Sequence, residues 1–236
     1  MAINMSKTAK VSLQRRQAYT EAKDGSFADR SAYSARLKIY RALSEIIDLE
    51  NLDSIIDVGV TANKTLALSN FFEKLYPMPE KITALSNEDA SWMEDEYKGL
   101  KFKQGTALDM PFEDNAFELV FSSAVIEHVG SYQNQSRFIR ECFRVSKKYV
   151  FITTPNRHYP IELHTLIPLI HWLPKNIHRR LLRLAGKDFF ALEENLNLLT
   201  RGGLKRLCEE NGIKRYNITT VNFFGLPSNL LLMIEK

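Results

Sequence analysis

The sequence is poor in cysteine, the residue that marks secreted, disulfide-rich proteins. Only two of its 236 residues are cysteines, Cys142 and Cys208, and they lie far apart in the chain. This spacing gives no metal or redox motif and favours a reducing compartment. No apolar run is long enough to span a bilayer, and the basic N-terminus lacks the apolar core of a signal peptide. We therefore expect a soluble, cytoplasmic protein.

Neither sign of charge predominates, since the net charge is only +4. This mild excess suits an anionic partner but does not require nucleic acid. The basic residues are not interleaved with a run of stacking aromatic residues, so we do not expect a nucleic-acid partner. The length is sufficient for one α/β domain with a continuous core.

Short apolar runs alternate with segments of helical period along most of the chain. The pattern predicts strands at 54–59, 81–86, 100–105, 116–123, 148–155, 215–221 and 228–236. It predicts helices at 35–49, 65–76, 88–97, 131–146 and 199–212, the last with Gly212 as its C-terminal cap. Such alternation favours an α/β fold, a Rossmann-like doubly wound and mostly parallel seven-stranded sheet. We expect a single domain over 1–236, with an N-terminal helical segment at 1–50.

Residues 156–195 break this rhythm. They contain three prolines and four of the five histidines of the chain: His158, His164, His171 and His178. We interpret the segment as a largely helical cap inserted over the ligand edge of the sheet. No two of these histidines have the i, i+4 spacing of a helical zinc motif, so we expect no metal site. The basic, amphipathic stretch 177–186 is either a packed lid helix or a surface for anionic head groups, so peripheral membrane contact stays open.

The ligand edge of the sheet can be located from the predicted strands. In an open parallel sheet, ligands bind at the carboxyl ends of the strands. This rule selects five short stretches, 57–61, 86–89, 105–109, 122–124 and 154–157. The first begins as a nucleotide-binding loop does, but it is poor in glycine, because Val60, Thr61, Ala62 and Asn63 follow Gly59.

The longest motif is "GTALDMPFEDNAFELVFSSAVIEHV", residues 105–129. It resembles the class I S-adenosylmethionine-dependent methyltransferases, in particular their small-molecule type 11 branch. The resemblance covers residues 55–154 closely, and the C-terminal helix and strands more loosely. The matching residues are Asp109, Met110, Pro111, Phe112, Asp114, Asn115, Phe117, Glu118, Val120, Glu127 and His128.

The resemblance implies S-adenosylmethionine as the cofactor and a set of residues that bind it. The opening loop would hold the amino-acid end of the cofactor, and an acidic residue after the second strand would bind the ribose. That residue is Glu88 or Asp89, and we favour Glu88. Two positions depart from the family: Thr61 stands where a glycine is usual, and Thr106 where aspartate is frequent. The expected cofactor-binding residues are Asp57, Gly59, Thr61, Glu88, Asp89, Thr106, Ala107, Ser122 and Ser123.

The resemblance further implies a methyltransferase that acts on a small molecule or glycan, at oxygen. The "DVGVT" loop and the "HTLIPLIHWLP" insertion are similar to those of bacterial proteins that resemble enzymes of surface-polysaccharide biosynthesis. His128 is the candidate catalytic base, or a packed histidine that fixes the loop. The candidate acceptor-binding residues are Asn156, His158 and His164. The alternatives are a non-catalytic interaction protein and methyl transfer to a nitrogen or lipid acceptor.

Overall fold

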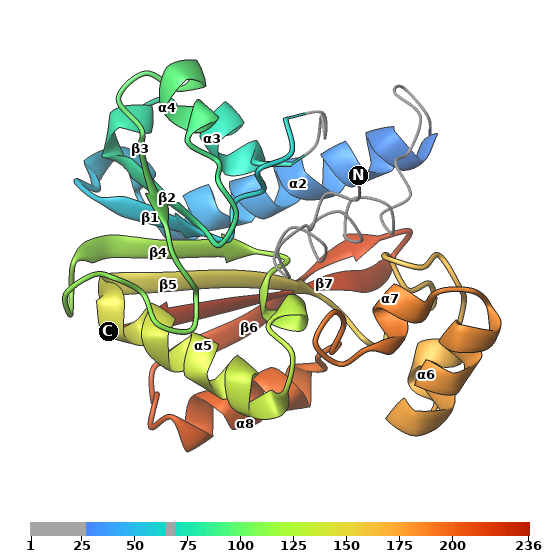
Figure 1. Ribbon diagram of the computed structural model, residues 1–236. Coiled ribbons are helices and arrows are strands. Elements are labelled where there is room, and N and C mark those ends of the chain that lie inside the picture. Colours follow the sequence, from blue (N-terminus) through green and yellow to red (C-terminus); the bar gives the residue numbers. More distant parts are fainter. Residues whose placement is uncertain (1–26, 65–68) are drawn as a thin grey trace, which may run out of the picture.

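A seven-stranded sheet forms the centre of the protein in a computed structural model, which describes residues 27–64 and 69–236 (Figure 1). The strand order is β3-β2-β1-β4-β5-β7-β6. The first five strands are parallel, and β7 runs antiparallel to both of its neighbours. The expected Rossmann-like, mostly parallel sheet is confirmed. The strands are β1 Ile55–Val58, β2 Ile82–Ser86, β3 Lys101–Gln104, β4 Phe117–Ser123, β5 Ser146–Pro155, β6 Tyr216–Phe223 and β7 Leu226–Glu235.

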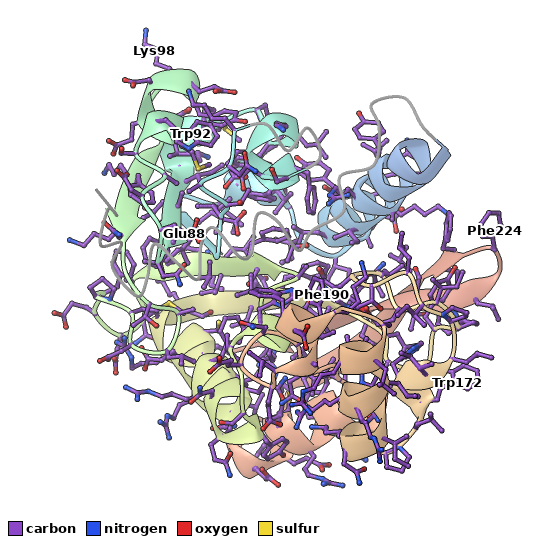
Figure 2. The ribbon with its side chains drawn as sticks, turned by 45° about the vertical axis from the view of Figure 1, so that its right-hand side comes forward. Glu88, Trp92, Lys98, Trp172, Phe190 and Phe224 are labelled. Carbon is purple, nitrogen blue, oxygen red and sulfur yellow. The ribbon has the colours of Figure 1, made fainter. Side chains whose placement is uncertain are left out.

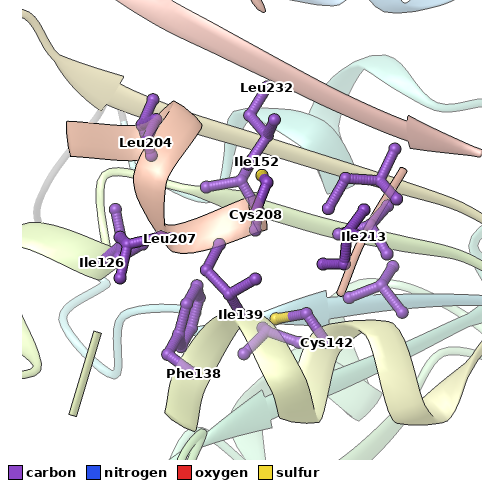
Figure 3. Packing of buried hydrophobic residues seen from close by; sticks show 14 of the residues in the cluster. Ile126, Phe138, Ile139, Cys142, Ile152, Leu204, Leu207, Cys208, Ile213 and Leu232 are labelled. Atoms are coloured by element: carbon purple, nitrogen blue, oxygen red, sulfur yellow. The ribbon is translucent and has the colours of Figure 1, made fainter. Parts of the chain in front are cut away.

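Helices cover both faces of the sheet (Figure 1). One face is covered by α2 Phe27–Ile46, α3 Phe71–Leu75 and α4 Trp92–Glu96, and the other by α5 Tyr132–Val145 and α8 Arg201–Glu210. The 3-10 turns η1 Leu49–Asn51 and η2 Pro79–Lys81 precede β1 and β2. Because successive side chains of a strand point to opposite faces, β1 supplies both cores. Ile56 and Val58 join the α5–α8 core, and Ile55 joins the other. Figure 3 shows Ile139 of α5 and Cys208 of α8 within the first.

The helix boundaries differ from expectation at three places. In the expected N-terminal helical segment 1–50, residues 1–26 lie outside the described residues, and α2 spans 27–46 rather than the expected 35–49. The helix expected at 65–76 is short, since α3 spans 71–75, and residues 65–68 lie outside the described residues. The helix expected at 88–97 forms only over 92–96. In contrast, α8 is followed by Gly212 at φ 71°, as the glycine cap predicted.

The segment between β5 and α8 forms a small unit beside the sheet (Figure 1). It is less helical than expected, because helix is confined to η4 Ile170–Trp172, α6 Lys175–Leu184 and α7 Asp188–Ala191, and turns fill the remainder. Prolines at 160, 168 and 174 interrupt its first half. The unit has its own small core of Leu182, Phe190, Ala191 and Leu196. Among the described residues, no helix combines the length and the apolar character that crossing a bilayer requires.

Candidate active site

The loop after β1 turns sharply at Gly59, whose φ is 97°. A Cβ atom here would lie 2.3 Å from Cγ2 of Val125, so only glycine fits this approach of the loop to the segment after β4. The N–H groups of Gly59 and Val60 both donate to the carbonyl of Leu85, at 2.8 and 3.2 Å. The expectation that these amides face a ligand is therefore wrong, because β2 already satisfies them.

Asn70 supports the second half of the loop. Its side-chain oxygen accepts from the N–H of Thr61 at 2.9 Å, and its amide nitrogen donates to the Thr61 carbonyl at 3.0 Å. The Thr61 hydroxyl accepts from the N–H of Asn63 at 3.3 Å. The threonine that replaces a glycine of the family thus stabilises the loop from within, and a contact of Thr61 with the cofactor stays a prediction.

Asp57 is buried at the end of β1, beside Glu73 of α3. Burial and the neighbouring Glu73 charge raise the pKa of Asp57 well above its ordinary range. Burial also raises the pKa of Glu73, neither of whose carboxylate oxygens has a hydrogen-bond partner among the described residues. Two buried carboxyl groups side by side favour the protonated form, because two charges so close are costly in a low dielectric.

The two acidic residues after β2 occupy different environments. Asp89 is exposed, and its Oδ1 accepts from the N–H of Ser91 at 3.0 Å at the start of α4. Glu88 is half-buried on the turn between β2 and α4 (Figure 2), and its carboxylate makes no hydrogen bond among the described residues. A half-buried carboxylate at a strand end is suited to accept from a ligand hydroxyl. This geometry supports Glu88, rather than Asp89, as the ribose ligand.

The remaining expected cofactor residues follow β3 and end β4. Thr106 is exposed and Ala107 half-buried in the loop after β3, where the Thr106 hydroxyl accepts from the N–H of Leu108 at 3.2 Å. Ser122 is fully buried, and its hydroxyl donates to the Val58 carbonyl of β1 at 2.7 Å. Ser123 pairs its hydroxyl with that of Thr153 at 2.8 Å, across β4 and β5. Ser122 therefore joins β4 to β1, and Ser123 lies nearer to the carboxyl ends of the strands.

Two of the three expected acceptor residues lie apart from the third. Asn156 donates to the Pro227 carbonyl at 2.9 Å and accepts from the N–H of His158 at 3.0 Å, so its side chain joins β5 to β7. His158 is exposed. His164 instead reaches the end of β4 and lies beside His128, with 3.1 Å between the two Nε2 atoms. The structure thus brings together the candidate base and one candidate acceptor residue.

Four side chains form a compact cluster at this point, and we call Glu127, His128, His164 and Glu162 the His–Glu cluster. Oε1 of Glu127 lies 3.9 Å from Nε2 of His128 and 4.0 Å from Nε2 of His164. Nδ1 of His164 lies 2.6 Å from Oε1 of Glu162. Nδ1 of His128 lies 2.6 Å from the carbonyl of Asn195. Each imidazole is therefore held at its Nδ1 atom, and the two Nε2 atoms point at each other.

The charges of the cluster follow from its partners. Burial alone would raise the pKa of Glu162, but the adjacent His164 charge and the hydrogen bonds from His164 and Thr165 lower it to about 2. Burial tends to lower the pKa of His164, yet the carboxylates of Glu162 and Glu127 raise it above its usual range. Burial raises the pKa of Glu127. Glu162 is thus a fixed anion, which favours a cation at or near His164.

His128 lies outside the helices. It ends the 3-10 turn η3, Ile126–His128, and α5 begins only at Tyr132. Asn197 anchors the turn, because its N–H donates to the Glu127 carbonyl and its side-chain amide to the Gly130 carbonyl, both at 2.7 Å. The chain just after the insertion thus holds η3 directly.

Glu127 and Glu162 were not predicted as site residues. Glu127 belongs to the quoted motif. Its complete burial, with an Oε1 that has no hydrogen-bond partner among the described residues, is visible only in the structure. Its other oxygen accepts from the Thr154 hydroxyl at 2.9 Å. In the sequence, the one local sign of a role for Glu162 is its spacing of two residues from His164. That spacing lets one carboxylate accept from both the N–H and the ring of the histidine.

Comparisons with known proteins agree with this fold. Residues 58–152 match the family model "Methyltransferase domain". A SAM-dependent methyltransferase from Aquifex aeolicus has a TM-score of 0.58 at 13% identity, over 98% of this chain and 99% of that one. A SAM-dependent methyltransferase from Thermotoga maritima has a TM-score of 0.57 at 16% identity, over 97% of each chain. Magnesium protoporphyrin IX methyltransferase from Synechocystis, with bound SAH, has a TM-score of 0.55 at 12% identity, over 98% and 94%.

A shorter similarity links the chain to a plant enzyme. Ajmaline N-methyltransferase from Rauvolfia serpentina is 49% identical over 47 residues, which are 20% of this chain and 15% of that protein. The match therefore spans a small part of the relative, while the family model covers the strands that carry the site. By this match residues 58–152 form a methyltransferase domain of the type 11 branch, and the chain as a whole shares the fold of S-adenosylmethionine-dependent methyltransferases.

Proposed function

We propose that the enzyme transfers the methyl group of S-adenosylmethionine to a hydroxyl oxygen of a small molecule or glycan, in polysaccharide or related biosynthesis. The observation that carries the proposal is the His–Glu cluster at the end of β4, where the matched domain meets the insertion. A hydroxyl acceptor must lose its proton as it attacks, and the cluster offers lone pairs for that proton. The polysaccharide assignment rests on the resemblance of the opening loop and the insertion sequence.

The chemistry needs little from the protein beyond alignment and proton removal. The cofactor supplies an activated methyl group on a sulfonium leaving group. The S–CH₃ bond breaks with its electron pair going to sulfur, the O–CH₃ bond forms, and the hydroxyl proton leaves. We propose that His128 or its partner His164 receives that proton, and that residues of the insertion hold the acceptor. Glu88, the loop after β1 and the end of β4 would hold the cofactor.

Labelled S-adenosylmethionine tests the proposal directly. The wild-type enzyme is incubated with sugars, nucleotide sugars and lipid-linked sugars, and label transfer is scored. We expect one hydroxyl-bearing class to be methylated, and we expect His128→Gln to lower kcat by about 10²–10⁴-fold with cofactor affinity unchanged. If S-adenosylhomocysteine shows no binding heat at millimolar concentration, the non-catalytic interaction protein replaces this proposal.

A lipid-linked acceptor is a second candidate, and the surface of the insertion supports it. Large apolar side chains are exposed there beside the basic residues Arg180 and Arg183 of α6, and Trp172 projects from this surface in Figure 2. An apolar surface bordered by arginines suits an anionic membrane interface. Sedimentation with phosphatidylglycerol vesicles, but not phosphatidylcholine vesicles, should carry the enzyme down, and Trp172→Ala should weaken this. The exposed apolar residues are Ile161, Leu163, Leu166, Leu169, Trp172, Leu173, Ile177 and Leu184.

A further inference from the structure

The tautomers of the two facing histidines can be assigned from their partners. Nδ1 of His128 lies 2.6 Å from a carbonyl oxygen, which can only accept, so that nitrogen carries the proton. Nδ1 of His164 lies 2.6 Å from Oε1 of Glu162, a carboxyl group that already accepts from the N–H groups of His164 and Thr165, so this nitrogen also carries the proton. In the neutral rings both Nε2 atoms therefore present lone pairs, and they do so to each other at 3.1 Å.

Two lone pairs at this distance repel, so the arrangement requires a positive charge shared by the two nitrogens. Glu127 supplies a further lone pair, because its Oε1 is fully buried, has no hydrogen-bond partner among the described residues and lies 3.9–4.0 Å from both nitrogens. A proton can satisfy the histidine pair, but it leaves this carboxylate oxygen unpaired. A divalent cation would satisfy all three atoms at once.

We propose that Glu127, His128 and His164 bind one divalent transition-metal ion through Oε1 and the two Nε2 atoms. Ligand atoms bound at about 2.0–2.2 Å to one ion lie roughly 3–3.6 Å apart, so the observed spacing needs only a small inward movement of Glu127. Two imidazoles and one carboxylate are the donors that Zn²⁺, Co²⁺, Mn²⁺ and Fe²⁺ accept, whereas Mg²⁺ and Ca²⁺ favour oxygen donors.

The groups behind the ligands fit the same proposal. A histidine that binds a metal usually donates its other ring N–H to a carboxylate or backbone carbonyl, which fixes the tautomer and orients the ring. His164 has Glu162 in this position, and His128 has the Asn195 carbonyl. The third ligand is oriented as well, because the Thr154 hydroxyl donates to Oε2 of Glu127 and leaves Oε1 directed at the two rings.

Three protein ligands leave coordination positions open for the acceptor. With the ion bound, both Nε2 lone pairs are occupied, so an acceptor hydroxyl on the ion would release its proton to water rather than to a histidine, and more readily than a free hydroxyl does. This role rests on the proposed function, whereas ion binding itself does not. The ion would also join η3 to the insertion, since Glu127 and His128 come from the first and His164 from the second.

Metal titration of the full-length enzyme tests the proposal. Protein stripped with a chelator is titrated with Zn²⁺ by calorimetry and with Co²⁺ by visible absorption. We expect one Zn²⁺ to bind per chain. We also expect intense visible absorption bands of Co²⁺, which indicate that the ion has a low coordination number. Glu162→Gln, which removes only the support behind His164, should weaken Zn²⁺ binding by about 10–100-fold, and His164→Gln by more. The matched control is His178→Gln, a histidine of the same insertion outside the cluster, which should leave binding unchanged.

Each outcome decides the ion site. No binding to the wild type overturns the proposal, as does binding that survives both His128→Gln and His164→Gln. If those variants do not fold, pulsed paramagnetic resonance of Cu²⁺ on the wild type must show two coupled imidazoles, and fewer overturns it. Methyl transfer at full rate by metal-free enzyme would leave the proposed function standing and remove the ion from it. Ion binding without methyl transfer to any hydroxyl acceptor would leave the ion site standing and overturn the proposed function.

Discussion

At the residue scale, the pair of Asp57 and Glu73 makes the apoprotein sensitive to pH. Both pKa values are raised, chiefly by burial, so the folded state holds protons more tightly than the unfolded chain. A raised carboxyl pKa gives stability that is complete below the pKa of the unfolded chain. That stability is lost as the pH rises through the folded-state values.

We therefore expect the free energy of unfolding of the apoprotein to decrease as the pH rises from about 4. Glu73→Gln should flatten this dependence and raise stability at neutral pH, because an amide cannot ionise. Chemical denaturation at several pH values measures both effects. The exposed Glu113 gives the control Glu113→Gln, and an equal flattening in that variant would show that the pair is not the cause.

Glu88 and Asp109 give a second prediction at the same scale. Glu88 is half-buried at the end of β2, whereas Asp109 is exposed and lies 3.6 Å from Arg137. Glu88→Gln should weaken S-adenosylhomocysteine binding by about 1.5–3 kcal/mol, because a carboxylate bond to the ribose is lost. Asp109→Asn should leave the affinity near that of the wild type. Calorimetry compares the two, and a larger loss for Asp109 would place the ribose elsewhere.

At the element scale, one arginine of α5 fixes the loop between β3 and β4. The guanidinium of Arg144 donates to the carbonyls of Met110 and Phe112, to Asp114 and to both oxygens of Glu141. The motif that carries the family resemblance is thus largely a loop clamped to a helix.

Arg144→Ala should therefore lower stability by about 1–3 kcal/mol, because several carbonyl and carboxylate groups lose a charged donor together. Arg144→Lys should recover only part of the loss, since an ammonium cannot present the same planar set of donors. Thermal and chemical unfolding measure both. Arg140→Ala, at an exposed position of the same helix, is the control, and a comparable loss there would exclude a specific clamp.

The insertion allows a prediction about a whole element. Its core of Leu182, Phe190, Ala191 and Leu196 is separate from the two cores of the sheet. Its ends are also close together, because the N–H of Arg157 donates to the Leu199 carbonyl at 2.9 Å. Both features favour removal of the segment without loss of the sheet.

A variant with a short glycine-serine linker in place of residues 158–195 should fold and bind S-adenosylhomocysteine. It should lose methyl transfer, because His164 and the Asn195 carbonyl that holds the ring of His128 leave with the segment. Calorimetry and the label-transfer assay separate the two effects. Retained turnover on the acceptor identified for the wild type would show that the insertion does not form the acceptor side.

At the scale of the whole molecule, the sheet could be predicted from sequence and the cluster could not. Runs such as Ile55–Val58 and Phe117–Ser123 are buried on both faces, so each strand can be recognised as a continuous apolar run in the sequence. His128 and His164 are 36 positions apart, and turns, not helices, bring them together. No local spacing encodes that contact, so the rule for helical zinc motifs gave no signal. The amides of the opening loop were misjudged for the same reason, since their acceptor Leu85 lies on another strand.

The strand order also has a consequence for how the protein is made. β7 is the last strand in the chain, yet it lies inside the sheet, hydrogen-bonded to β5 on one side and β6 on the other. Synthesis from the N-terminus delivers β6 before the strand that attaches it. On the ribosome, β5 therefore waits with one open edge until residues 226–235 emerge from the exit tunnel. The nascent chain passes through an interval in which that edge can pair with another chain.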